Sequence, residues 1–177
     1  WSGLWVRQDL LEKAGLEEPK TVDDWTNMLR VFKEQFGTYM GLNITQWYGV
    51  ATNYAFAAAY DTCYEWMNKD GVATYGPAEP GYKDFLALLN TWYSEGLYDP
   101  DFATLSNSDY QSKMADGTYG AFGSAYGEIG QAKVSGMNAN PEYKLLAVHT
   151  PVATEGQTTH LRQYDSIVRS DYDVLTA

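Results

Sequence analysis

The chain has 177 residues, of which 45% are hydrophobic, and this composition suits a folded domain with a core of its own. Its net charge is −11, from 12 basic against 23 acidic residues, so we expect a solvated acidic surface that does not bind nucleic acid. No apolar run approaches the roughly 18–20 residues of a membrane helix. The single cysteine, Cys63, excludes an internal disulfide and is expected to be a buried structural thiol.

The first third of the chain predicts two helices separated by a break. Residues 4–15 are expected to form a short helix that Gly15 ends. Thr21 and Asp24 then have the spacing of a capping box. Behind them, apolar residues recur at steps of three and four, which predicts a second helix that ends at Gly37. These residues are Val22, Trp25, Leu29, Phe32 and Phe36.

The rest of the chain predicts helices that alternate with strands. The expected elements are an extended segment over 39–50, a helix of small residues over 53–60, a hairpin over 66–75 with Asp70-Gly71 at its turn, a helix through Phe85 and Trp92 to Gly96, a helix over 108–115, a strand over 119–126, a short helix from Glu128, a strand over 144–151 and an extended segment over 166–168. Because no repeat or linker interrupts them, we expect residues 1–177 to form a single α/β domain.

A search for catalytic and metal-binding patterns finds none. His149 and His160 are too far apart for a helical ligand pair, and Asp99 and Asp101 lack the further oxygen ligands of a calcium loop. No Gly-x-Ser-x-Gly elbow occurs, and Ser124 would act as a nucleophile only if a histidine reached it. We therefore expect no catalytic residue, no metal site and no cofactor.

Glycines recur from the predicted strand over 119–126 into the helix that follows. They are Gly117, Gly120, Gly123, Gly127 and Gly130. Their spacing matches neither a dinucleotide-binding fingerprint nor a P-loop. One interpretation is a tight, closely packed turn from strand to helix. Another is a junction that presents backbone N–H groups to a polar ligand, and phosphate binding is a third.

Aromatic residues are abundant, with 15 tyrosines, 6 tryptophans and 6 phenylalanines. Those at helical spacing are predicted to be core residues. Trp47, Tyr48, Tyr54 and Tyr126 instead stand at predicted loops or element ends. There, a ring would offer a flat apolar platform to the C–H face of a sugar, with polar groups beside it.

Three stretches resemble a known family. The first covers residues 4–16 and 19–25, LWVRQDLLEKAGL and PKTVDDW. The second covers residues 82–102, YKDFLALLNTWYSEGLYDPDF, and the third covers residues 102–117 followed by YGAFG at 119–123. Their order and spacing are similar to family 1 of the extracellular solute-binding proteins, the group that includes maltose-binding protein. The resemblance extends over nearly the whole chain, but only as the middle portion of a longer protein.

The resemblance implies one lobe of a two-lobed periplasmic-binding-protein-like fold, with a small mixed sheet flanked by helices. Residues 1–177 would form most of the second lobe, and about 160–177 would cross back toward the first. The implied function is solute capture for an ABC importer, with closure of the lobes on a ligand and no bond broken. The aromatic content favours a mono- or oligosaccharide. A carbohydrate-active enzyme domain and a stand-alone carbohydrate-binding module are the alternatives.

The resemblance also implies a site and a location. Tyr54 and Tyr126 fall on or beside the aromatic residues that stack on sugar in the maltose-binding branch, and Trp47, Asn53 and Ser124 are expected as neighbouring contacts. The expected macromolecular partner is the permease of an ABC transporter. The expected location is extracellular, as a cell-surface lipoprotein or a periplasmic protein, with a lipid anchor outside these residues as the only link to a membrane.

Overall fold

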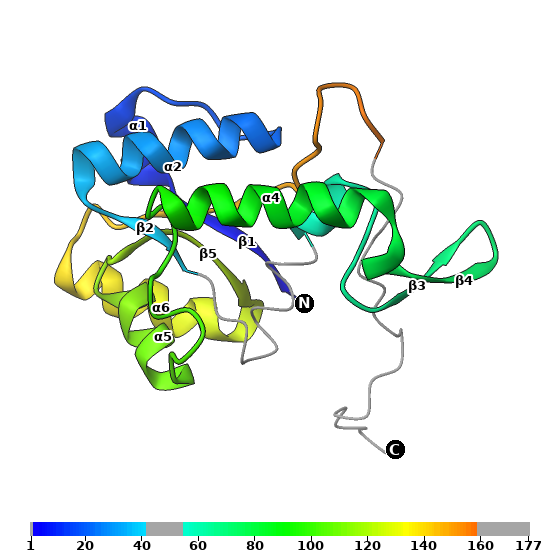
Figure 1. The fold of residues 1–177 in the computed structure, drawn as a ribbon. Coiled ribbons are helices and arrows are strands. Elements are labelled where there is room, and N and C mark those ends of the chain that lie inside the picture. The colour runs from blue at the N-terminus through cyan, green and yellow to red at the C-terminus, as the bar shows by residue number, and fades with distance from the viewer. Residues whose placement is uncertain (1, 42–54, 159–177) are drawn as a thin grey trace, which may run out of the picture.

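A computed structural model describes residues 2–41 and 55–158 as a small sheet with helices on both faces (Figure 1). Its elements are β1 (Ser2–Arg7), α1 (Gln8–Ala14), α2 (Val22–Phe36), β2 (Tyr39–Gly41), β3 (Trp66–Lys69), β4 (Val72–Tyr75), the 3-10 helix η1 (Gly76–Ala78), α4 (Pro80–Ser94), α5 (Asn107–Ala115), β5 (Tyr119–Ala125), α6 (Tyr126–Ala139) and β6 (Leu145–Val148). Residues 55–59 are also helical. Within the described ranges, no helix is long and apolar enough to span a bilayer. The expected extended segment over 166–168 and residues 42–50 of the earlier one lie outside them.

Strand β1 lies inside a four-stranded mixed sheet of order β2-β5-β1-β6. It pairs antiparallel with β5 on one edge and with β6 on the other, so that Leu4 stands opposite both Gly123 and Val148. β2 extends the sheet by pairing parallel to β5. Helices α1 and α2 cover one face, and α5 and α6 cover the other (Figure 1). The predicted α/β architecture with a mixed sheet is confirmed.

The start of the chain differs from the prediction of a single helix over 4–15. Residues 4–7 belong to β1, and α1 begins only at Gln8. Leu4 and Val6 are buried against α2, whereas Trp5 packs on the opposite face. A strand that is buried on both faces is apolar throughout and lacks the alternation that marks a half-exposed strand, so the pattern did not distinguish it from a helix. Gly15 does end α1, with a φ of 66°.

Helix α2 begins and ends as predicted. The Asp24 amide donates to the Thr21 hydroxyl at 3.1 Å, and the Asp24 carboxylate accepts from the Thr21 amide at 2.8 Å. This reciprocal capping box satisfies two N–H groups at the helix start. The hydrogen bond from the Thr21 backbone also holds the pKa of Asp24 below its usual value. At the other end, Gly37 adopts a φ of 67° and closes the helix.

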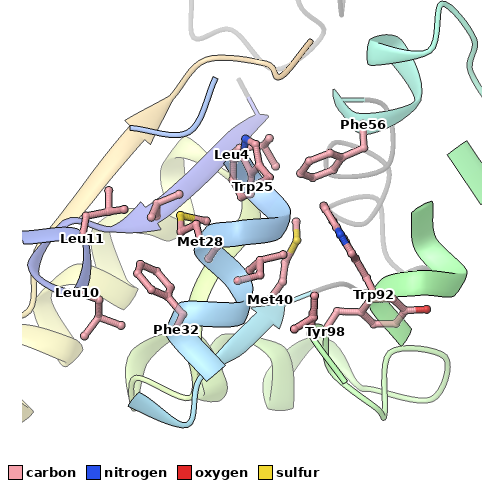
Figure 2. Packing of buried hydrophobic residues seen from close by; sticks show 14 of the residues in the cluster. Leu4, Leu10, Leu11, Trp25, Met28, Phe32, Met40, Phe56, Trp92 and Tyr98 are labelled. Carbon is pink, nitrogen blue, oxygen red and sulfur yellow. The ribbon is translucent and has the colours of Figure 1, made fainter. Parts of the chain in front are cut away.

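Three aromatic rings join α2, residues 55–59 and α4 in the main core (Figure 2). Phe56 meets Trp25 edge to face at 5.1 Å between centroids, and Trp92 on its other side at 4.9 Å. The Trp92 indole N–H donates to the Thr26 hydroxyl at 3.0 Å, which satisfies a polar group inside this core. Trp25, Phe32, Phe85 and Trp92 are buried and Phe36 is partly buried, so their predicted place in the core is confirmed.

A buried ion pair marks the junction between β1 and α1. The Arg7 guanidinium donates to both carboxylate oxygens of Asp9, at 2.7 and 2.6 Å, and it lies 4.2 Å over the ring of Tyr143. Burial opposes the charge on Asp9, but hydrogen bonding and charge from Arg7 outweigh it, so the pKa of Asp9 lies below its ordinary value. The Lys144 amide also donates to Asp9 at 3.3 Å.

The remaining elements follow the predictions, except that β6 covers only Leu145–Val148 of the strand expected over 144–151 and that α6 is longer than expected. The hairpin β3–β4 turns at Asp70 and Gly71, which have φ angles of 54° and 83°. Cys63 is buried, with its sulfur 3.2 Å from the Glu65 carbonyl oxygen.

Helix α6 is not short: it begins at residue 126 and continues to 139. Its glycines weaken the helical pattern in the sequence, whereas packing of Ile129 and Ala132 in the core beneath α5 stabilises the helix.

Gly81 gives a test of the packing of α4. A Cβ at this position would lie 2.0 Å from the Tyr60 carbonyl oxygen, so Gly81→Ala must displace backbone. We expect it to lower the free energy of unfolding by about 1–3 kcal/mol, measured by urea denaturation. Gly130→Ala is the control, because a Cβ there would meet no described atom within 4 Å and alanine favours a helix. Equal stability of Gly81→Ala and the parent would contradict this packing.

Candidate ligand-binding site

The candidate site lies at the edge of the sheet where β2 and β5 end. These two strands are parallel, so Gly41 and Ala125 reach the same edge. β1 is antiparallel to β5, which places its first residue, Ser2, opposite Ala125 at this edge (Figure 1). In open α/β sheets, ligands bind outside the carboxyl ends of the strands.

At this edge the chain passes from strand to helix without a loop. Ala125 is the last residue of β5 and Tyr126 is the first residue of α6. The first N–H groups of a helix have no partner within it and favour polar or negatively charged groups. Gly127 is exposed, and a Cβ there would meet no described atom within 4 Å. The backbone of Tyr126 is thus at the predicted junction, and its contact with a ligand stays a prediction.

Ser124, near the end of β5, lies beneath the surface of the candidate site. Its side chain is fully buried, and its hydroxyl is 3.4 Å from one carboxylate oxygen of Glu128, one helical turn further on. The other oxygen of Glu128 accepts from the Gln111 amide of α5 at 3.1 Å. A negative charge in the first turn of a helix is favoured by the helix dipole. The structure therefore places Ser124 in the wall of the candidate site, and its predicted role as a ligand contact is untested.

Helix α5 lies under the same edge and contributes a buried tyrosine. The Tyr110 hydroxyl lies 2.8 Å from the Gly123 carbonyl oxygen and 3.2 Å from that of Gly41. Burial raises the pKa of Tyr110 far above its ordinary value, so its hydroxyl keeps its proton and acts as a donor. The aromatic pattern did not single out this residue, because a tyrosine on a short helix resembles any other core residue.

Three predicted site residues, Trp47, Asn53 and Tyr54, lie outside the described residues. They belong to the segment 42–54, which connects the end of β2 to the helical residues 55–59. The segment leaves the described structure at Gly41, on the edge where Tyr126 begins α6. Their approach to Tyr126 stays a prediction.

The glycines of the β5–α6 region serve three different purposes. At Gly120, a Cβ would lie 2.5 Å from the Thr38 hydroxyl and 2.6 Å from the Phe32 ring, which supports the close-packing interpretation there. Gly117 adopts a φ of 85°, which favours glycine. Gly127 and Gly130 instead leave the surface of α6 open among the described residues, as a ligand-facing junction requires.

Asp99, which lacks the further ligands of a calcium loop in the sequence, has a different role in the structure. Its carboxylate is fully buried and accepts hydrogen bonds from the Tyr119 hydroxyl, from the Lys113 ammonium at 2.9 Å and from the Asp101 amide at 3.0 Å. Burial and the hydrogen bond to Asp99 raise the pKa of Tyr119, which stays a donor. In the described part of the chain, no three His, Cys, Asp or Glu residues are grouped as metal ligands.

The chain belongs to the family of bacterial extracellular solute-binding proteins, whose model matches residues 1–160. This match confirms the family indicated by the sequence resemblance. Among curated proteins, Lipoprotein LipO of Bacillus subtilis (strain 168) is 28% identical over 130 residues, which are 65% of this chain and 25% of LipO.

Solved structures share the fold at low sequence identity. The alginate-binding protein AlgQ2 has a TM-score of 0.71 at 18% identity, over 88% of this chain and 33% of its own. An extracellular solute-binding protein from Bifidobacterium longum subsp. infantis has a TM-score of 0.68 at 19% identity, over 89% and 34%. A sugar transporter protein from Bacillus licheniformis, in complex with stachyose, has a TM-score of 0.65 at 19% identity, over 88% and 41%. This chain spans from a quarter to about two fifths of the relatives' length.

The buried network at Asp99 predicts unequal effects of two neighbouring substitutions. Asp99→Asn removes a fully buried charge that Lys113 and Tyr119 contact, and we expect it to lower the free energy of unfolding by about 1.5–3 kcal/mol, the range for hydrogen bonds to a charged group. Asp101→Asn removes a carboxylate that is 64% exposed and also pairs with Lys113, so its expected cost is below about 1 kcal/mol. Urea denaturation measures both. Equal costs, or stabilisation of the parent by Ca²⁺ that both variants lose, would contradict a purely structural role.

Proposed function

We propose that the protein captures a carbohydrate, a mono- or oligosaccharide, and delivers it to an ABC importer. The observation that carries this proposal is the family match over residues 1–160. Two structural relatives, named as an alginate-binding protein and as a sugar transporter protein in complex with stachyose, favour a carbohydrate among the possible solutes. The abundance of tyrosine and tryptophan agrees with a ligand that has C–H faces.

In this proposal residues 1–177 form most of the second lobe of a two-lobed protein, and about 160–177 begin the crossover to the first. The ligand binds between the lobes, and its contacts with both lobes favour the closed state. The closed state then reports an occupied site to the permease. No bond in the ligand is made or broken, so the protein acts as a binding protein and not as an enzyme.

The proposed ligand-facing residues of this lobe are those at the edge where β2 and β5 end. Tyr126 and Tyr54 stack on the sugar, Asn53 supplies a polar contact, Trp47 adds a further aromatic face, and the buried Ser124 supports this surface from behind. The position of Tyr126 at the start of α6, beside the open surface of Gly127, supports this assignment. The proposed location is extracellular, with a lipid anchor outside these residues, and the name of Lipoprotein LipO supports an anchor.

The full-length protein tests the proposed function by its change in shape. Small-angle scattering is recorded with stachyose, with alginate oligosaccharides and without sugar, and the expected result is a smaller radius of gyration with at least one sugar. Residues 1–177 alone should bind that sugar weakly, because one lobe supplies only part of the contacts. Full-strength binding by this segment would indicate a stand-alone binding module, and release of shortened sugars, followed by chromatography, would indicate an enzyme.

Tyr126→Ala tests the stacking residue in the same full-length protein. We expect the free energy of sugar binding to weaken by about 1–3 kcal/mol in calorimetry, because the substitution removes an aromatic platform. The control is Tyr75→Ala on the projecting hairpin, where an exposed tyrosine contacts the Trp66 ring. Unchanged affinity in Tyr126→Ala, or an equal loss in both variants, would move the site away from the β5–α6 junction.

A further inference from the structure

The Tyr110 hydroxyl bridges β2 and β5 at the last described residue of β2. The last described pair of β2 and β5 is Gly41 and Phe122. Beside this pair, the Tyr110 hydroxyl is 2.8 Å from the Gly123 carbonyl oxygen and 3.2 Å from that of Gly41. A hydroxyl has one proton, so it donates chiefly to the nearer Gly123 and more weakly to Gly41.

The Gly123 carbonyl stands beside the predicted ligand-facing junction. Gly123 is followed by Ser124 and by the start of α6. Gly41 is the last residue of β2, and residues 42–54 follow it. One side chain from a third element, α5, is therefore within hydrogen-bonding distance of both β2 and β5, at Gly41 and Gly123.

Tyr110 is itself held firmly in place. It is fully buried, and its ring packs against that of Tyr119 at 5.2 Å between centroids. α5 begins at a Ser106 cap, whose hydroxyl accepts from the Asp109 amide at 3.1 Å. Gln111, which follows Tyr110 on α5, donates a hydrogen bond from its side-chain amide to the Glu128 carboxylate in the first turn of α6, at 3.1 Å. α5 thus contacts the β5–α6 junction through two adjacent side chains.

We propose that Tyr110 is a positioning residue for the ligand-binding site: its hydroxyl sets the separation between the β2 end and the β5–α6 junction. The inference rests on the proposed function, in which the β5–α6 junction contacts the sugar. Tyr110 does not touch the ligand. It acts through the Gly123 and Gly41 carbonyls, which would lose a hydrogen-bond donor in a phenylalanine variant.

The test compares two buried tyrosines in the full-length protein. Tyr110→Phe removes the bridging hydroxyl. Tyr143→Phe is the matched control, since Tyr143 is also buried and its hydroxyl donates to the Met114 carbonyl oxygen at 2.7 Å, beside Arg7. Each variant loses one buried hydrogen bond, and similar falls in melting temperature are expected.

Affinity and amide exchange are the readouts that separate the two variants. With the sugar that compacts the parent, and well below both melting temperatures, Tyr110→Phe should bind at least about fivefold more weakly, as expected for loss of one hydrogen bond at the site. Tyr143→Phe should bind as the parent does. Hydrogen exchange of the amides from Ser124 to Gly127 should accelerate in Tyr110→Phe alone.

Several outcomes would overturn the inference. Parental affinity in Tyr110→Phe, or an equal loss of affinity in both variants, would show that the hydroxyl contributes only to stability. If no sugar binds the parent, the proposed function fails instead. The exchange comparison then still decides whether Tyr110 positions the junction, because it needs no ligand, and unchanged exchange from Ser124 to Gly127 would overturn the inference.

Discussion

The buried ion pair between Arg7 and Asp9 fixes the place at which β1 becomes α1, and the arrangement of the sheet depends on this point. Asp9 also accepts from the Lys144 amide, and Arg7 lies over the Tyr143 ring, so the pair fixes the return of the chain into β6 as well. A buried charge without its partner is costly. A slip of β1 by one residue would move Asp9 away from the Lys144 amide and Arg7 away from the Tyr143 ring, which is why the position of β1 beside β6 is closely specified.

The two ends of the sheet consequently have different properties. Arg7 lies at the carboxyl end of β1, where charged groups are paired and buried. The opposite end brings together the start of β1, the end of β2 at Gly41 and the end of β5 at Ala125. There the chain enters α6 beside the open surface of Gly127. Rigidity at one edge therefore supports a surface available for binding at the other, as suits a site built on a firm scaffold.

Local signals in the sequence predicted the elements whose ends depend on local chemistry. The capping box at Thr21 and Asp24 and the turn at Asp70-Gly71 require residues within a few positions of one another, and both are confirmed. The strand character of β1 could not be predicted in this way, because it depends on pairing with β5 and β6, more than a hundred residues further along the chain.

In the candidate site, too, features that depend on neighbouring residues could be predicted from the sequence, whereas features that depend on distant contacts could not. The glycines and Tyr126 indicated the β5–α6 junction, and the four-residue spacing of Ser124 and Glu128 was a signal that sequence reasoning missed. The role of Tyr110 depends on carbonyls 13 and 69 residues away, and no local pattern reveals such contacts. The resemblance to a family pointed to Trp47, Asn53 and Tyr54, whose positions relative to the junction remain predictions.

The direct passage from β5 into α6 also has a mechanical consequence. No loop residue separates Ala125 from Tyr126, so a change in the direction of the backbone at this point reorients α6 directly relative to β5. At 1.5 Å per residue, α6 is about 20 Å long, and its first residue, Tyr126, is the one proposed to contact the ligand. A tilt of a few degrees at Tyr126 would displace the far end of the helix by more than an ångström, so a small adjustment at the site would reach the opposite side of the lobe.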